Sequence, residues 1–167
     1  MSSEIGLPNG FVLEPMTPAD LEEVLAIEDA SFKAPWTRNV FAQELATSIA
    51  RSLVIRITIK GRQILAGYAI FWIVANEVDI QKIAVKPEYR RLGTATCLLK
   101  ALLQSARDKG CTAATLEVRR SNTAAIRLYE KLGFVVKGIR RCYYSEQGED
   151  ALIMGTDIPS LNGPAEL

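Results

Sequence analysis

The sequence contains no histidine among its 167 residues. Ser-His-Asp and Cys-His catalysis are therefore excluded, because both depend on an imidazole as the base. Zinc sites that are built on histidine are excluded for the same reason. Any proton transfer must use Glu, Asp, Tyr, Lys, Cys or water.

Cysteine and long apolar runs are also scarce. Cys97, Cys111 and Cys142 are the three cysteines, and no two of them have C-x-x-C spacing. Their odd number and spacing argue against a disulfide framework and against a Cys-rich metal site. The longest apolar run, residues 64–75, falls well short of the roughly 18 residues of a membrane-spanning helix. No targeting segment is evident at residues 1–10, so we expect a soluble, cytoplasmic protein.

Positive and negative charges are nearly balanced. Lys plus Arg is 20 and Asp plus Glu is 19, a formal net charge of +1. Nucleic-acid-binding proteins usually carry a clear basic excess, so no direct nucleic-acid partner is expected. The length fits one domain that can bury a core without disulfides or a metal. We expect this domain over residues 11–157, between a loose N-terminal extension (1–10) and a loose C-terminal tail (158–167).

Hydrophobic periodicity and turn residues predict an α/β protein, with helices packed on one mixed (α+β) sheet of about seven strands. The strands are expected at residues 11–15, 52–60, 63–75, 78–86, 112–119, 134–144 and 150–154. Four helices are expected, after the capping residues Thr17 and Thr37, from Gly93, and after Ser121 or Asn122.

The predicted strand over residues 78–86 changes phase. Val78 and Ile80 alternate correctly, whereas the apolar residues from Ile83 onward are one residue out of step. A β-bulge near Gln81-Lys82 would produce such a slip. The alternative is a strand buried on both faces, in which alternation is blurred. We expect the bulge, because bulges are frequent beside active sites.

The junction between this strand and the next helix has features of an anion site. A loop with Arg90, Arg91 and Gly93 leads into the helix. The first amides of a helix lack intrahelical partners, and the helix dipole favours an anion beside them. Glycine lets the backbone approach a ligand closely, so the junction suits a pyrophosphate. The alternative is an ordinary turn with two exposed arginines.

Two residues are candidates for acid–base chemistry. Glu117 lies within a strand, where a carboxylate is disfavoured, and it becomes a candidate base if its face of the strand is buried. The alternative is a solvated edge strand on which Glu117 pairs with Arg119. Tyr129 lies on the apolar stripe of the following helix, which also fits a role in the core. In a chain without histidine, however, a phenol is one of the few general acids left.

Aromatic residues that could line a groove include Trp36, Tyr143 and Tyr144. Core packing is the default for each of them. Tyr143 and Tyr144 are the better candidates, because adjacent strand residues point to opposite faces and cannot both enter one core.

Several segments carry a resemblance to a known family. Arg90-x-x-Gly93-x-Ala95, after Ile83-Ala84-Val85, resembles the acetyl-CoA signature of the GCN5-related N-acetyltransferase superfamily. Three later segments resemble the ribosomal-protein-alanine N-acetyltransferases (RimI-type). They are Leu116-Glu117-Val118-Arg119-x-Ser121-Asn122, Leu128-Tyr129-x-x-Leu132-Gly133-Phe134 and Arg140-x-x-Tyr143-Tyr144. The resemblance extends from about Phe11 to Asp157. One departure is Ala95, where many relatives have glycine.

The resemblance implies an acetyltransferase fold with a bulged, splayed central strand pair. It implies acetyl-CoA as cosubstrate, no metal, Glu117 as general base and Tyr129 as general acid. The cofactor-binding residues that it implies are Ile83, Ala84, Val85, Arg90, Arg91, Leu92, Gly93, Thr94, Ala95, Thr96 and Asn122. The acceptor-binding residues that it implies are Trp36, Tyr143 and Tyr144.

The implied reaction is acetylation of a protein N-terminus, the N-terminal alanine of a small-subunit ribosomal protein. An α-amine has a pKa of about 8 and a lysine of about 10.4, so a modest base suffices for the former. We expect a monomer or weak oligomer without a membrane partner. The alternatives are acetylation of small-molecule amines or lysine side chains, and a non-catalytic CoA-binding module.

Overall fold

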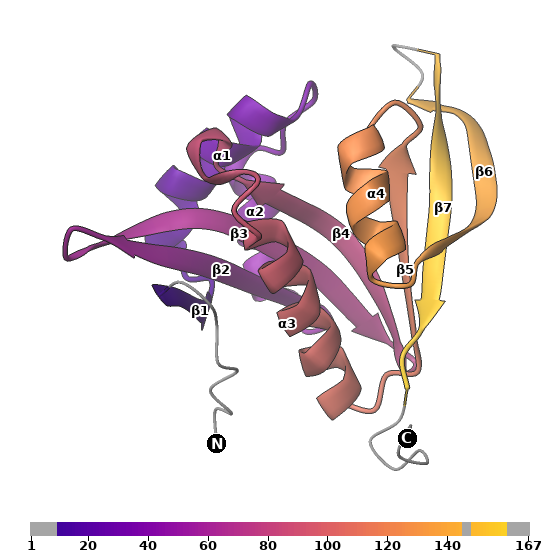
Figure 1. Ribbon diagram of the computed structural model, residues 1–167, viewed down its shortest axis with the longest axis horizontal. Helices are drawn as coiled ribbons and strands as arrows, with labels where there is room; N and C mark the ends of the chain where they lie inside the picture. The colour runs from indigo at the N-terminus through magenta and orange to yellow at the C-terminus, as the bar shows by residue number, and fades with distance from the viewer. Residues whose placement is uncertain (1–9, 145–147, 160–167) are drawn as a thin grey trace. The chain divides into compact units, whose positions relative to one another are not determined.

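The computed structural model describes residues 10–144 and 148–159 (Figure 1). These residues form seven strands and four α-helices, in the order that the sequence predicts. The strands are β1 (Phe11–Pro15), β2 (Ala50–Ile59), β3 (Arg62–Val74), β4 (Glu77–Val85), β5 (Ala113–Arg119), β6 (Val135–Tyr144) and β7 (Glu149–Asp157). The helices are α1 (Leu21–Ser31), α2 (Arg38–Ala46), α3 (Thr94–Asp108) and α4 (Thr123–Lys131), with the short 3-10 helices η2 (Pro18–Asp20) and η3 (Pro87–Tyr89). Most of the predicted loose ends, residues 1–9 and 160–167, lie outside the described residues.

The strands form one mixed sheet in the order β1-β2-β3-β4-β5-β7-β6, which confirms the predicted fold class. β4 and β5 pair in parallel from Glu77↔Ala113 to Ile80↔Leu116. The bulge predicted further along β4, near Gln81-Lys82, stays a prediction. Among the described residues the chain divides into two compact units. The first comprises residues 10–72 and 82–102, and the second comprises residues 73–81, 103–144 and 148–159.

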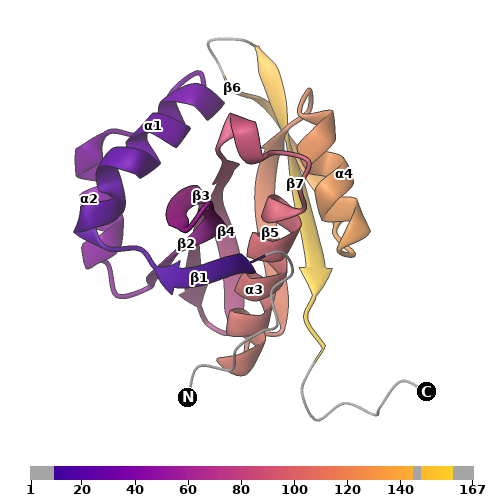
Figure 2. The same cartoon turned by 60° about the vertical axis from the view of Figure 1, so that its left-hand side comes forward.

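In the first unit, β1, β2 and β3 are antiparallel neighbours, and α1 and α2 lie side by side (Figure 2). Helix α2 starts where the sequence predicts, because the Thr37 side chain accepts a hydrogen bond from the Val40 N–H. Before α1, η2 replaces the first α-helical turn expected after Thr17. The core of this unit is built from Met16, Leu21, Val24, Ile27, Phe41, Val54, Leu65, Tyr68, Ile70 and Ala84.

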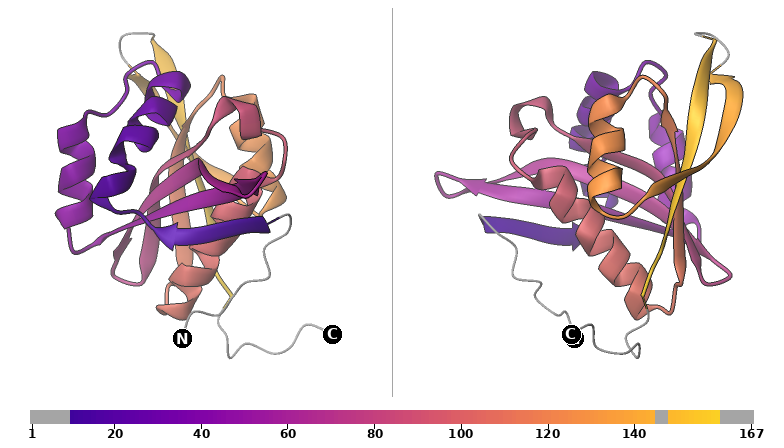
Figure 3. Two further views of the ribbon diagram at one scale, coloured as in Figure 1. Left: turned by 90° about the vertical axis from the view of Figure 1, so that its left-hand side faces the viewer. Right: turned by 45° about the vertical axis from the view of Figure 1, so that its right-hand side comes forward.

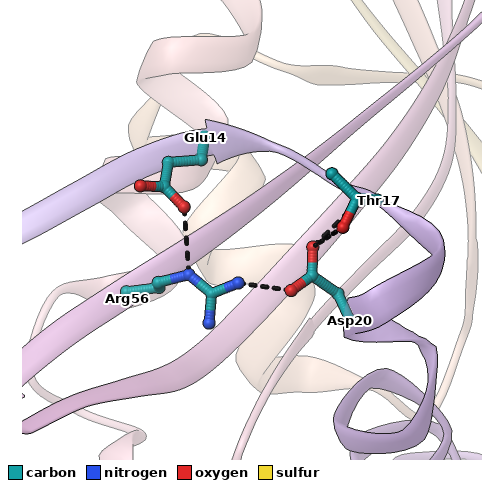
Figure 4. Close-up of polar contacts among 4 residues, drawn as sticks. All are labelled: Glu14, Thr17, Asp20 and Arg56. Atoms are coloured by element: carbon teal, nitrogen blue, oxygen red, sulfur yellow. Dashed lines mark hydrogen bonds and ion pairs between the residues drawn. The ribbon is translucent and has the colours of Figure 1, made fainter.

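A polar network joins β1, η2 and β2 (Figure 4). Arg56 Nε on β2 donates to Glu14 Oε2 at 3.1 Å, and its guanidinium also pairs with Asp20. Asp20 Oδ2 accepts from the Thr17 N–H at 2.9 Å. Asp20 is buried, so these partners supply the compensation that a buried carboxylate needs. The network holds the start of α1 against the strands.

In the second unit, β7 lies between β5 and β6 and pairs antiparallel with both (Figure 3). Ala114, Leu116 and Val118 of β5 are buried, whereas Thr115 and Glu117 are partly exposed, which confirms the predicted alternation. Asn122 caps α4, since its side chain accepts from the Ala125 N–H at 3.2 Å. None of the helices within the described residues is long and apolar enough to cross a bilayer.

Candidate active site

Hydrogen bonds within the loop between β4 and α3 fix its shape. In η3 the Tyr89 N–H donates to Lys86 O at 2.9 Å. Thr94 Oγ1, at the start of α3, donates to Tyr89 O at 3.0 Å. Thr94 is buried, so its hydroxyl ties the helix start firmly to the loop.

The backbone at the start of α3 has the geometry of an anion site. Arg91 and Gly93 both have left-handed backbone conformations, with φ of +63° and +81°. Glycine adopts such a conformation without steric cost. The Cys97 N–H donates to Gly93 O at 2.9 Å, so the amides of residues 94–96 precede this bond in the helix. Together with the helix dipole, these amides favour an anionic group.

Arg90 and Arg91 differ in their contacts, although sequence reasoning assigned both to the ligand. Arg90 Nε donates to Val85 O at 3.0 Å, and Arg90 Nη2 donates to Ser31 Oγ at 3.1 Å. The Arg90 side chain therefore links the loop to the end of β4 and to α1. Arg91 and Leu92 are exposed at the turn before Gly93. Arg91 is thus the better placed of the two cations to meet an incoming anion.

The backbone of β4 before this loop lies very close to β3. A Cβ on Gly67 of β3 would lie 2.7 Å from Ala84 O, nearer than real Cβ atoms approach. The Lys86 N–H donates to Ala66 O at 2.7 Å. Ala84 and Val85 are buried, and Ile83 is partly buried. Residues 83–85, the predicted thioester-binding strand, are therefore held by β3.

Glu117 is partly exposed and paired. Its side chain is 29% exposed, and its Oε1 accepts from Arg140 Nε at 2.9 Å. The predicted alternative of an edge strand is wrong, because β5 lies between β4 and β7 in the sheet order. Arg119 Nη1 lies 3.4 Å from Glu149 Oε2. Arg140 belongs to β6, two positions from β5 in the sheet order. No sequence pattern pointed to it as the partner.

Tyr129 is a buried phenol on α4. It is 9% exposed, and its ring centroid lies 5.8 Å from that of Phe134. Burial raises the pKa of Tyr129 to about 12, with a smaller contribution of the same sign from Tyr144. The phenol therefore remains protonated at neutral pH and can act as a hydrogen-bond donor.

Tyr143 and Tyr144 do not point to opposite faces, so this prediction is wrong. Their ring centroids lie 5.2 Å apart, edge to face. The pairing of β6 with β7 shifts register between Arg140 and Tyr144, and Cys142 within that stretch has φ of +50°. The strict alternation of a strand is lost there. The Arg119 guanidinium lies 3.7 Å from the Tyr144 ring centroid.

Sequence reasoning missed a buried carboxylate in the first unit. Glu28 accepts hydrogen bonds from the Trp36 N–H at 2.9 Å, from Lys82 Nζ at 2.5 Å and from the Tyr68 hydroxyl. The backbone of Trp36, the predicted acceptor-binding residue of this unit, is thus bonded to Glu28. The spacing of Leu21, Val24 and Glu28 on one helical face is a signal that could have indicated this burial.

Comparisons with known proteins agree with the fold and with the predicted family. The family model described as acetyltransferase (GNAT) family matches residues 21–134. A protein of Bacillus subtilis (strain 168) is 41% identical over 140 residues, which are 83% of this chain and 90% of that protein. The ribosomal protein bS18-alanine N-acetyltransferase of Escherichia coli (strain K12) is 38% identical over 141 residues, 83% of this chain and 92% of that enzyme.

A solved structure has the same fold. It is the crystal structure of the ribosomal-protein-S18-alanine N-acetyltransferase from Escherichia coli, with a TM-score of 0.80 and 34% identity. The match covers 94% of this chain and 99% of that one. The chain therefore belongs to the acetyltransferase (GNAT) family.

Proposed function

We propose that this protein transfers the acetyl group of acetyl-CoA to the α-amine of a protein N-terminus, the N-terminal alanine of ribosomal protein bS18. The observation that carries the proposal is the Escherichia coli relative named for this reaction, which is 38% identical and matched over 92% of its length. We assign the chemistry of this reaction to the start of α3, Glu117 and Tyr129. A ribosomal acceptor implies that the reaction occurs in the cytoplasm.

The start of α3 fits the pyrophosphate of CoA. Its first amides, at residues 94–96, precede the first helical hydrogen bond, and Gly93 has no atom within 4 Å of where a Cβ would stand. A phosphate can therefore approach the backbone closely. We assign the amides of residues 91–96 to the pyrophosphate, the backbone of residues 83–85 to the pantetheine arm and Asn122 to a further cofactor contact. Bound acetyl-CoA supplies an acetyl thioester.

Glu117 is the proposed base. Its Oε1 is held by Arg140, and we assign Oε2 to accept the proton of the acceptor ammonium, directly or through water. The neutral amine then attacks the acetyl carbonyl, so that a C–N bond forms and the C–S bond breaks. CoA leaves as a thiolate, and the second proton of the attacking nitrogen passes to this thiolate, directly or through water. Because an α-amine is partly neutral at pH 7, this base need not be strong.

Tyr129 is the proposed partner of the departing sulfur. With a pKa of about 12, its hydroxyl is protonated when the reaction begins. A thiol has a pKa of about 8.5, so complete proton transfer from this phenol to the thiolate is unfavourable. We therefore refine the predicted role of general acid to that of a hydrogen-bond donor, which stabilises the charge that develops on sulfur.

The test is thiol release from acetyl-CoA with two peptides that begin Ala-Arg-Tyr and carry an internal lysine, one of them with a blocked N-terminus. We expect release with the free N-terminus alone. Glu117→Gln should lower kcat by roughly 100-fold or more, the usual contribution of a general base. Glu130→Gln, an exposed glutamate on α4, is the matched control and should leave kcat unchanged.

Other outcomes would point elsewhere. Turnover of the blocked peptide would indicate lysine as the acceptor. CoA binding without turnover of either peptide would indicate a different amine or a binding module. An unchanged kcat in the double variant Glu117→Gln, Tyr129→Phe would refute the proposed catalytic roles.

A further inference from the structure

A buried ion pair in the first unit has no part in the proposed chemistry. Glu28 is fully buried on α1, and the side chain of Lys82 on β4 is 12% exposed. Lys82 Nζ lies 3.7 Å from the ring centroid of Phe32 and 4.8 Å from that of Trp36. The ammonium is therefore held by one carboxylate and two aromatic faces, an arrangement that stabilises a cation away from water.

One carboxylate joins four segments of this unit. Glu28 Oε1 accepts from Lys82 Nζ on β4 and from the Trp36 N–H in the segment 32–37, which follows α1. Its Oε2 accepts from the Tyr68 hydroxyl on β3. Burial lowers the pKa of Lys82, and the contact with Glu28 opposes that shift. Loss of the cation would leave a buried carboxylate with hydrogen bonds but no countercharge, which is unfavourable.

We propose that Lys82 is a positioning residue that holds the segment 32–37, and Trp36 within it, in place for the acceptor. The inference rests on the proposed function, in which Trp36 contacts the acceptor. Lys82 directly precedes residues 83–85, which are assigned to the thioester end of the cofactor. One side chain thereby fixes the acceptor segment relative to the strand that presents the acetyl group.

The main variant is Lys82→Met, which keeps an unbranched apolar chain and removes the cation. We expect KM for the acceptor peptide to rise about tenfold, since the cation–π contacts to the segment and the ion pair with Glu28 are both lost. KM for acetyl-CoA should stay within about twofold, because the start of α3 is untouched. Hydrogen exchange should accelerate at the amides of residues 32–37, which include the Trp36 N–H bonded to Glu28.

Two variants serve as controls. Lys82→Arg keeps a cation between the rings and should restore the acceptor KM to within about threefold of the wild type. Glu14→Gln weakens another ion pair of the same unit, that with Arg56, and should change neither acceptor KM nor exchange in residues 32–37. If Lys82→Met does not fold, Glu28→Gln is the substitute, because it keeps the shape of the carboxylate. We expect a raised acceptor KM and faster exchange in residues 32–37 from it as well.

Faster exchange together with a raised acceptor KM supports the proposal. Unchanged exchange, or faster exchange with an unchanged acceptor KM, overturns it. If the wild-type protein does not acetylate the free peptide, the proposed function fails and the acceptor role of Lys82 falls with it. The exchange measurement would still decide whether Lys82 anchors the segment, so the two failures can be told apart.

Discussion

Tyr129 illustrates how burial sets the chemistry of a single side chain. Its pKa of about 12 in the folded protein lies above the roughly 10 of a phenol in the unfolded chain. The stabilisation that results is complete below pH 10 and is lost as the pH rises towards 12, because the unfolded chain releases this proton first.

We predict that Tyr129 alone lowers the free energy of unfolding by up to about 1.4 kcal/mol per pH unit in that range. Tyr129→Phe should remove this contribution, as measured by urea unfolding at pH 9, 10 and 11. Burial also raises the pKa of Tyr68, so the free energy of unfolding falls further with pH, equally in the wild type and in Tyr129→Phe. The difference between the proteins therefore isolates Tyr129, and identical slopes would contradict the assignment.

Glu117 and Glu28 show that a carboxylate cannot be classified from its own position alone. Glu117 lies on a strand and is paired but partly exposed, whereas Glu28 lies on a helix and is fully buried. The sequence drew attention to Glu117, because strands disfavour glutamate. Helix propensity gave no reason to single out Glu28, because glutamate is common in helices. Their partners Arg140 and Lys82 are 23 and 54 residues away in the chain, beyond the reach of local patterns.

At the scale of elements, the contact between β3 and β4 depends on a glycine. A Cβ at Gly67 would lie 2.7 Å from Ala84 O and 3.2 Å from Leu98 Cδ1. Because Ala84 O belongs to the backbone, it cannot move aside as the end of a flexible side chain can.

We predict that Gly67→Ala lowers the free energy of unfolding by about 2–3 kcal/mol, the cost of overpacking a core. It should also weaken acetyl-CoA binding, since residues 83–85 would shift. Gly138→Ala is the matched control, because its nearest atom would be Ile153 Cδ1 at 3.6 Å, an ordinary contact. Urea unfolding and isothermal titration check both variants. A Gly67→Ala protein as stable as the wild type would show that β4 can move freely.

The end of β6 shows where reasoning about elements fails. Strand alternation predicted opposite directions for Tyr143 and Tyr144, but their rings touch because the register is irregular between Arg140 and Tyr144. The residues that conflict with a regular ladder are those of the motif assigned to the acceptor. Irregular strands are common at functional sites, where they redirect side chains.

At the scale of the whole molecule, ligand binding should raise stability by mass action. Acetyl-CoA at 100 times its Kd should add about 2.7 kcal/mol to the free energy of unfolding. For a chain of this length that corresponds to a rise in Tm of roughly 5–10 °C. Differential scanning fluorimetry measures it, with pantetheine as the control ligand. Pantetheine lacks the pyrophosphate, so an equal rise with both ligands would contradict the anion site at α3.

The periodicity of the sequence predicted the fold class, and the family resemblance added the reaction and its cosubstrate. The loop before α3 and the segment around Glu117 identified the family, and the family comparisons confirm it. The assignments of Glu117, Tyr129, Asn122 and the acceptor residues remain predictions that the proposed assays address. The strand order β5-β7-β6 and the partner of Glu117 required the tertiary structure.

The sequence by itself determined the order of the elements, the cap at Thr37 and the alternation of β5. These features arise from interactions between residues a few positions apart, which periodicity and capping record. Only the tertiary structure decided the Glu28–Lys82 pair, the Glu117–Arg140 pair and the raised pKa of Tyr129. Each of these depends on burial and on partners that are distant in the chain, because the cost of removing a charge or phenol from water is set by everything packed around it.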